Sequence, residues 1–196
     1  MIAGITTTPN RTEYLNNVIL QLIPYVRRIY LFNDIKMSGH WANTMSMYDY
    51  VLKKAEKDEP VLTCTDDILF TKNWFNKFEN IHKEFNHHTY TLFSAKPHTA
   101  RLNKSILGIH KKNLYDQAVI FINQGDLIQR LNNWINNENE LDKRITSKKH
   151  FDVAVQEYYI SNNIEWVLVI PNLVDHIGKN STLKHKIGSS YTFKYD

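Results

Sequence analysis

The sequence predicts an α/β fold in which a mostly parallel central sheet is flanked by helices. Three observations lead to this prediction. Over the first seventy or so residues, β-rich runs alternate with amphipathic helical segments, polar residues follow each of the first three runs, and no repeat or linker divides the chain. A β-α-β-α-β order implies parallel strands joined by right-handed crossovers. We therefore expect one Rossmann-like domain over residues 1–196.

The individual elements follow from the spacing of apolar residues. A β-rich run at residues 2–7 stops at the turn signal Pro9-Asn10-Arg11, and Thr12 is the expected N-cap of a helix that runs to about Tyr25. The same patterns predict further strands at 29–32, 61–64, 89–93, 117–123 and 165–170, and further helices at about 42–57, 73–85, 127–135 and 151–160.

Two segments could be mistaken for functional features. Cys64, the single cysteine, lies in an apolar strand, so we interpret it as a small core residue rather than a nucleophile. The helix after Asn73 carries an aromatic stripe at helical spacing, which indicates core rather than a platform for base stacking. The polar residues 136–149 are expected to form a surface connection.

Composition narrows the classes of protein. With 42% hydrophobic and 22% charged residues the chain is of ordinary globular type, and its net charge of +4 permits an anionic partner without requiring one. No run approaches the ~20 apolar residues of a membrane span, and no signal-peptide pattern occurs. The single cysteine fits a reducing compartment, so we expect a cytoplasmic protein, in the host cytoplasm if it is phage-encoded.

The strongest candidate site is Asp66-Asp67, directly after the predicted strand 61–64. Ligands of open α/β sheets bind outside the carboxyl ends of the strands, and paired carboxylates suit a divalent cation. Alternatively, one of the two acids caps the helix that begins near Asn73. The residues that follow the first two strands are expected at the same edge of the sheet: Thr7, Thr8, Asn10, Arg11, Asn33 and Asp34.

No glycine-rich phosphate loop accompanies these residues. The chain has neither GxGxxG nor GxxxxGK[ST], so it supports neither a dehydrogenase nor a P-loop NTPase. A diphosphate bound without such a loop needs a metal ion or basic side chains, which fits the paired acids. Arg11 is a candidate phosphate contact, although it could equally be a surface residue at a helix start.

Two segments more than a hundred residues apart carry a family resemblance. Thr65-Asp66-Asp67-Ile68 is followed by Lys72, Asn73, Trp74 and Phe75, and the second segment reads Pro171-Asn-Leu-Val-Asp-His-Ile-Gly-Lys-Asn-Ser-Thr-Leu183. They resemble the Glu-Asp-Asp-Ile motif and the Pro-Ser-Leu-Phe-Gln-His-x-Gly-x-x-Ser-Ser-Leu segment of the type IV β-1,4-N-acetylglucosaminyltransferases that branch N-glycans (glycosyltransferase family 54). The layout also resembles the GT-A fold of nucleotide-sugar glycosyltransferases. Thr65 departs from the motif's Glu.

The resemblance implies a metal-dependent, inverting hexosyl- or N-acetylhexosaminyltransferase that uses a UDP-sugar. Asp67 and His176 would bind Mn²⁺ or Mg²⁺, and Asp66 would contact the ribose or support the metal. Asn33 and Asp34 would bind the nucleobase, and three further residues would contact the donor: Asn43, Lys179 and Ser181. His176 could instead be structural, and the lysines could belong to a solvated basic tail.

An inverting transfer also needs a carboxylate to take the proton of the acceptor hydroxyl. Asp152, near the start of the predicted helix 151–160, is the expected base, with Glu157 as the substitute. Alternatively, Asp152 is a first-turn acid that complements the helix dipole.

The acceptor and two other classes of function stay open. The acceptor is either a glycan or a hydroxylated base in DNA, as in phage DNA modification. Basic residues that would contact an anionic acceptor, or would form a solvated face, are Lys96, His98, Arg101, Lys104, His110, Lys111, Lys112, Lys148, Lys149 and His150. One alternative is a non-catalytic nucleic-acid-binding module. The other is a nucleotidyltransferase on a similar sheet, although the usual glycine-rich nucleotide loop is missing.

Overall fold

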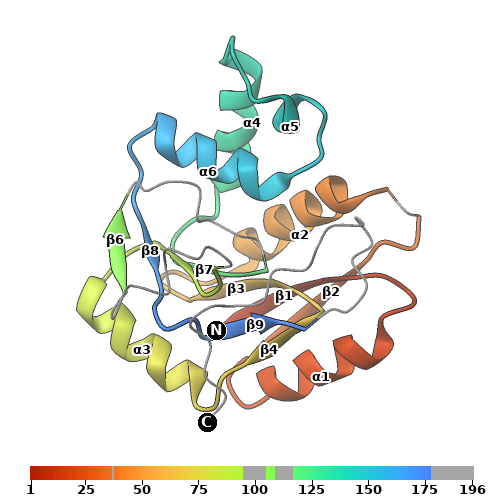
Figure 1. Cartoon of the computed structure of the whole chain (residues 1–196), viewed down its shortest axis with the longest axis vertical. Helices are drawn as coiled ribbons and strands as arrows, with labels where there is room; N and C mark the ends of the chain where they lie inside the picture. Colours follow the sequence, from red (N-terminus) through yellow and green to blue (C-terminus); the bar gives the residue numbers. More distant parts are fainter. Residues whose placement is uncertain (37, 95–104, 109–116, 178–196) are drawn as a thin grey trace.

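The computed structural model describes residues 1–36, 38–94, 105–108 and 117–177. Within these ranges the central sheet has the order β2 (Arg28–Asn33), β1 (Ile2–Thr7), β3 (Val61–Thr65), β7 (Ala118–Phe121), β5 (Thr89–Thr91), β8 (Trp166–Leu168) and β6 (Ile106–Gly108) (Figure 1). Among the strands of the described ranges, β7 and β6 alone run antiparallel to the rest of the sheet. The predicted α/β class with a mostly parallel sheet is confirmed.

Helices cover both faces of this sheet. α1 (Thr12–Leu22) and α3 (Trp74–Phe85) pack on one face, and α2 (His40–Lys54), α4 (Leu127–Asn137) and α6 (Phe151–Ser161) lie on the other (Figure 1). A hydrophobic core lies on each face of the sheet, and successive side chains of β3 point into one or the other. Val61 packs in the core beneath α2, whereas Leu62 and Cys64 pack in the core beneath α1 and α3. Cys64 is fully buried, as the sequence predicts for a core residue.

The helix boundaries correct two predictions. Arg11, not Thr12, is the N-cap of α1, and no side chain caps this helix. The helix ends at Leu22 rather than Tyr25. Ile23 still has helical dihedral angles, but Pro24 has no N–H to continue the hydrogen-bond ladder. The connection predicted over residues 136–149 contains a short helix, α5 (Lys143–Thr146), with Ile145 buried.

The aromatic stripe on α3 is core, as predicted. Trp74 and Phe78 are 2% and 1% exposed, and both pack in the core between α3, α1 and the sheet. The helix begins after Asn73, whose backbone has a left-handed φ of 56°. Neither Asp66 nor Asp67 is the N-cap of α3, so the alternative reading of the acid pair as a helix cap is wrong.

The parallel register brings three strand ends to one edge of the sheet. Thr7 of β1 lies opposite Asn33 of β2, and Thr6 lies opposite Thr65 of β3. A second small sheet forms beyond this edge from β4 (Ile68–Phe70) and β9 (Val174–His176), which run antiparallel. In the described ranges, no helix is both long and apolar enough to cross a membrane.

Candidate functional site

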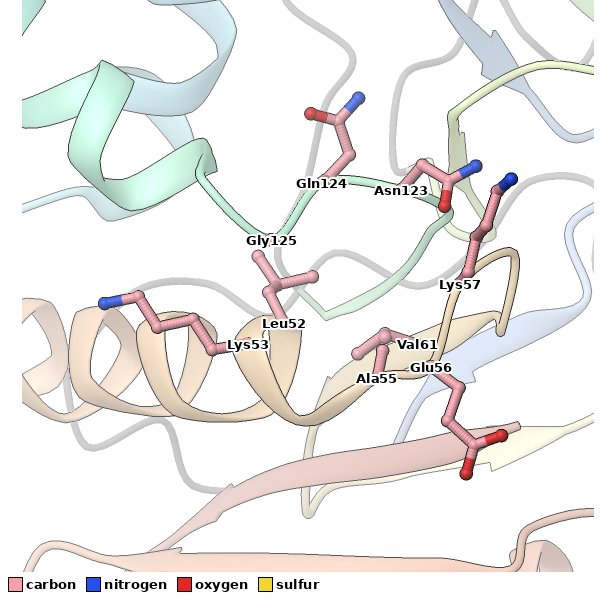
Figure 2. Close-up of a pocket in the computed structure, with 9 residues that line it drawn as sticks. All are labelled: Leu52, Lys53, Ala55, Glu56, Lys57, Val61, Asn123, Gln124 and Gly125. Carbon is pink, nitrogen blue, oxygen red and sulfur yellow. The ribbon is translucent and has the colours of Figure 1, made fainter.

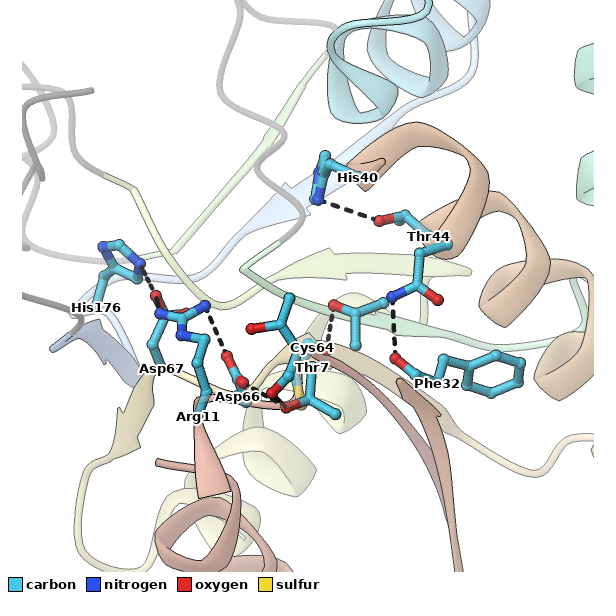
Figure 3. A network of polar contacts seen from close by, with 12 residues as sticks. Thr7, Arg11, Phe32, His40, Thr44, Cys64, Asp66, Asp67 and His176 are labelled. Carbon is cyan, nitrogen blue, oxygen red and sulfur yellow. Dashed lines mark hydrogen bonds and ion pairs between the residues drawn. The ribbon is translucent and has the colours of Figure 1, made fainter. Parts of the chain in front are cut away.

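The acid pair is buried at the end of β3 and shares one arginine (Figure 3). The side chains of Asp66 and Asp67 are only 1% and 6% exposed. Burying a carboxylate is costly unless it is paired. Arg11 provides the pairing, since its Nη1 lies 2.9 Å from Asp66 Oδ1 while its Nη2 contacts Asp67 Oδ2.

The end of β1 holds Asp66 from the other side. The hydroxyl of Thr7 donates a hydrogen bond to Asp66 Oδ2 at 2.6 Å, and the backbone N–H of Asp34 donates to the Thr7 carbonyl at 3.0 Å. The structure therefore brings together residues from the ends of β1, β2 and β3. This gathering follows from the parallel register and matches the sequence prediction.

His176 completes the cluster from a distant part of the chain. Its Nε2 lies 2.7 Å from Asp67 Oδ2, and the N–H of Ile177 donates to the Asp67 carbonyl at 2.8 Å. The antiparallel register of β4 and β9 sets this contact, because Ile68 lies opposite His176. The described parts of the two segments that carry the family resemblance, which reach Ile177, thus meet where β4 pairs with β9. We call Arg11, Asp66, Asp67 and His176 the acid cluster.

The two neighbouring carboxyl groups have pKa values displaced in opposite directions. Burial raises the pKa of Asp66, and this effect outweighs the hydrogen bond from Thr7 and the charge of Arg11. Burial also acts to raise the pKa of Asp67, but the contacts with His176 and Arg11 hold it well below its ordinary value. The surroundings therefore favour the charged form of Asp67 more than that of Asp66.

The donor atoms of the acid cluster fit Mn²⁺ or Mg²⁺ in kind. Carboxylates suit both ions and an imidazole suits Mn²⁺, and the buried Oδ1 of Asp66 accepts no hydrogen bond, although it lies beside Arg11. No group of three His, Cys, Asp or Glu residues in the described part of the chain is arranged to hold a metal. Metal ions bound to nucleotides often take only one or two carboxylates, together with phosphate oxygens. Asp67 and His176 would satisfy that smaller requirement.

The predicted nucleotide contacts near β2 also have local structural roles. The carboxylate of Asp34 accepts hydrogen bonds from the Ser38 N–H and hydroxyl, both at 2.7 Å, and from the Gly39 N–H at 2.9 Å. Burial opposes ionisation, but these bonds keep the pKa of Asp34 below its ordinary value. The Asn43 amide donates to the Phe32 carbonyl at 2.9 Å. Both side chains therefore shape the loop between β2 and α2.

The remaining predicted donor contacts lie at the edge of the sheet or outside the described residues. Asn33, the last residue of β2, and Asn10, in the turn after β1, are exposed, and Thr8, directly after β1, is partly buried. Lys179 and Ser181 lie outside the described residues, as does the predicted basic stretch from Lys96 to Lys104 and from His110 to Lys112.

The two candidate bases sit in different surroundings on α6. Asp152 is in the first turn of the helix, whose N-cap His150 makes no side-chain capping bond. Glu157 lies further along and lines a separate cavity of about 600 Å³ with Trp134 and Ile145 of α4 and α5. Asp152 is thus the candidate nearer the loop that precedes α6.

A basic pocket of about 560 Å³ lies where that loop meets the start of α2. The described residues that line it are Ser38, Gly39, His40, Trp41, Ala42, Lys148, Lys149 and His150. Sequence reasoning placed the last three in the basic stretch but missed His40, because nothing in the sequence indicates that the two loops meet. A different cavity, of about 340 Å³, lies at the other end of α2 and is lined by Leu52, Lys57 and Gly125 among others (Figure 2).

Comparisons with known proteins concern the fold. Neither a protein-family model nor a curated protein sequence matches this chain. Among solved structures, a putative glucose-1-phosphate thymidylyltransferase from Bacillus anthracis is similar with a TM-score of 0.52 and 9% identity, over 94% of this chain and 93% of that one. At this identity the likeness shows a shared α/β fold.

Two glycosyltransferases are also among the structural neighbours. GlyE of Streptococcus pneumoniae TIGR4 has a TM-score of 0.49 and 11% identity, over 96% of this chain and 57% of that one. A glycosyltransferase involved in the glycosylation of the major capsid of PBCV-1 has a TM-score of 0.47 and 12% identity, over 92% and 94%.

Proposed function

We propose that this protein is a glycosyltransferase that moves a sugar from a UDP-sugar to a hydroxyl acceptor. One observation carries the proposal. The two segments that resemble family 54 are separated by more than a hundred residues, yet the pairing of β4 with β9 brings them together and sets His176 2.7 Å from Asp67. The contact joins a buried carboxylate and a partly buried imidazole at the carboxyl edge of the sheet, where ligands of open α/β sheets bind.

The acid cluster would hold the diphosphate of the donor. Asp67 and His176 are proposed to bind Mn²⁺ or Mg²⁺, which would neutralise charge on the leaving diphosphate. Arg11, once released from the carboxylates, offers a planar guanidinium that suits phosphate oxygens. Asp66 would contact the ribose, while Asn33, Asn10 and Thr8, which lie at or after the ends of β1 and β2, would border the nucleoside.

Asp152 is the proposed base of the transfer. The acceptor oxygen would attack the anomeric carbon and form the new glycosidic bond while the bond to the diphosphate breaks. The electron pair leaves with the diphosphate, and the hydroxyl proton passes to the Asp152 carboxylate. A single displacement of this kind inverts the anomeric centre. The sugar would be a hexose or an N-acetylhexosamine, and the acceptor a glycan or a hydroxylated base in DNA.

The test is a thermal-shift and donor-hydrolysis screen of UDP-sugars with and without Mn²⁺. We expect one UDP-sugar to stabilise the wild type in the presence of Mn²⁺ and to release its sugar slowly. Asp67→Asn, which keeps the shape but removes the charge, should lose both responses. Asp49→Asn is the matched control, because this acid lies on the exposed side of α2 in a surface ion pair with Lys53.

Two other results would replace the proposal. Pyrophosphate release from a nucleoside triphosphate and a sugar phosphate, with no UDP-sugar response, would indicate a nucleotidyltransferase. Salt-sensitive DNA binding that needs no metal and is unchanged in Asp67→Asn would indicate a nucleic-acid-binding module.

A further inference from the structure

The basic pocket lies between the starts of α2 and α6, which pack against each other. Trp41, at the start of α2, is 8% exposed, and its ring packs edge-on against Phe151 at the start of α6, with 5.6 Å between ring centroids. This contact fixes the distance between the loops on either side of the pocket. The ring of His40 is positioned by Thr44, whose hydroxyl lies 3.4 Å from His40 Nδ1. Figure 3 shows His40 and Thr44 at the start of α2, in the same view as the acid cluster.

The charge of the pocket has one sign. Two lysines and two histidines stand among its described lining residues, and none of those residues is acidic. Asp34 lies close in sequence to Ser38 and Gly39, but its carboxylate is taken up by three hydrogen bonds from these two residues. A concave surface of this size and sign attracts an anion of the size of a phosphate ester.

The chain directs two lysines into this pocket from one tight turn. The N–H of Lys148 donates to the Ile145 carbonyl at 2.9 Å, and that of Lys149 donates to the Arg144 carbonyl at 3.0 Å. These bonds form a Schellman motif, in which the residue after the C-cap takes a left-handed conformation and is usually glycine. Here that residue is Lys148, with φ of 52°. A glycine at this position would suit the backbone better, so the lysine side chain can be removed without straining the turn.

We propose that the basic pocket binds a phosphate group of the acceptor. The proposal rests on the proposed function, because it assumes that the protein binds a sugar acceptor. It adds that this acceptor is a phosphate ester. Asp152 is not among the described residues that line the pocket, but it follows the lining residue His150 by two positions, in the first turn of α6. The proposed base and the pocket therefore share the start of this helix. The donor diphosphate has its own cationic partner in Arg11 at the acid cluster.

The test uses the full chain and calorimetric titrations with inorganic phosphate, glucose 6-phosphate and a short single-stranded oligodeoxynucleotide. The variant is Lys148→Gly with Lys149→Ala. The control is Lys53→Ala with Lys57→Ala, which removes the same charge at the far end of α2, around the cavity of Figure 2. We expect the first double variant to keep the wild-type Tm and to weaken phosphate-ester binding about tenfold or more, since it lacks two charge-assisted hydrogen bonds to the phosphate. The control should change binding less than about twofold, because its charges are screened over that distance.

The two phosphate sources are distinguished by which probe binds more tightly and by its salt dependence. For the oligonucleotide, removing a lysine that pairs with one phosphate should reduce the slope of log K against log salt by roughly 0.7. Equal weakening in both double variants would overturn the proposal, because a general charge effect would then explain it. Loss of UDP binding in Lys148→Gly, Lys149→Ala would also overturn it, because the pocket would then belong to the donor.

The failure of this inference can be told apart from the failure of the proposed function. The UDP-sugar response depends on Asp67, whereas the phosphate-ester response depends on Lys148 and Lys149. If phosphate esters bind through the lysines but no UDP-sugar acts on the protein, the assignment of the pocket to an acceptor is overturned together with the transferase. If the protein responds to UDP-sugars but phosphate-ester binding does not depend on Lys148 and Lys149, only the assignment of the pocket is overturned.

Discussion

Arg11 is the residue on which the chemistry of the acid cluster depends. Its guanidinium contacts both buried carboxylates, and its side chain is itself only 16% exposed. A divalent cation that binds Asp67 would meet the same oxygen, Oδ2, that already contacts Arg11 and His176. Arg11 and the metal should therefore compete for Asp67, and a donor diphosphate that attracts Arg11 should relieve the competition.

This competition predicts how Arg11→Ala behaves. Without metal the variant should lose about 3 kcal/mol of stability, because removing one partner leaves buried carboxylate charge uncompensated. Mn²⁺ should restore the stability, and should raise the Tm of the variant more than that of the wild type. Thermal melts at increasing Mn²⁺ concentration, with Arg11→Lys as the charge-preserving control, measure the effect. Equal Mn²⁺ shifts in all three proteins would contradict the competition.

At the scale of elements, the close packing of α2 on β1 depends on a glycine. A Cβ on Gly4 would lie 2.8 Å from Met47 Cγ and 3.0 Å from Val51 Cγ2. Gly4→Ala should therefore cost about 1–3 kcal/mol of stability, as overpacking of a core usually does. Met47→Ala opens space at the same place, so the double variant should be less destabilised than the sum of the single variants. Urea denaturation of the four proteins measures this coupling, and strict additivity would show that the two residues do not clash.

The helices and strands also show how much of the fold can be predicted from the sequence. The helix and strand periods predict the main elements, and the polar strand ends predict where Thr7, Asp66 and Asp67 gather. The contact between Asp67 and His176 could not be predicted, because β4 and β9 are three-residue strands without a period of their own. Their pairing is decided by tertiary packing across more than a hundred residues. The resemblance named both residues, but only the fold joins them.

Local side-chain contacts are the other part that sequence could not supply. Asp34 and Asn43 have the residue types of nucleotide contacts, yet their hydrogen bonds run to Ser38, Gly39 and the Phe32 carbonyl. The same chemistry that binds a ligand also closes a loop, and a one-dimensional pattern does not separate the two uses. The Schellman turn at Lys148 was missed for a related reason, since its usual signal is a glycine.

At the scale of the whole molecule, the two edges of the sheet carry different kinds of ion pair. The carboxyl edge holds the acid cluster, in which the Asp67 carboxylate is paired with Arg11 and His176. At the opposite edge, just before β2 and β3, Arg27 donates from Nε and Nη2 to the two carboxylate oxygens of Glu59, both at 2.7 Å. This bidentate pair joins the segments that lead into β2 and β3, the two strands on either side of β1, and its hydrogen-bonding groups are used within the fold. The first pair should therefore serve binding and the second stability.

This division predicts the pH dependence of Glu59→Gln. The hydrogen bonds from Arg27, although opposed by desolvation, lower the pKa of Glu59 from 4.5 to about 2. The folded state therefore binds fewer protons at this site than the unfolded state between these values. The stabilisation is fully present above pH 4.5 and is lost as the pH falls through about 2. Glu59→Gln should lower the Tm by a few degrees at pH 7, and the difference from the wild type should vanish on acidification.

The controls for this prediction compare variants at the two edges of the sheet. Glu56→Gln, at a neighbouring side chain that is 76% exposed, should shift the Tm much less at any pH. Glu59→Gln should also leave the UDP-sugar response intact, whereas Asp67→Asn should abolish it, because only Asp67 lies at the edge where the strand ends meet. Melting curves from pH 2 to pH 7 and one donor titration for each variant decide the matter. Parallel pH profiles for Glu59→Gln and the wild type would show that the Arg27 pair does not stabilise the fold, and a lost donor response in Glu59→Gln would show that the two edges are coupled.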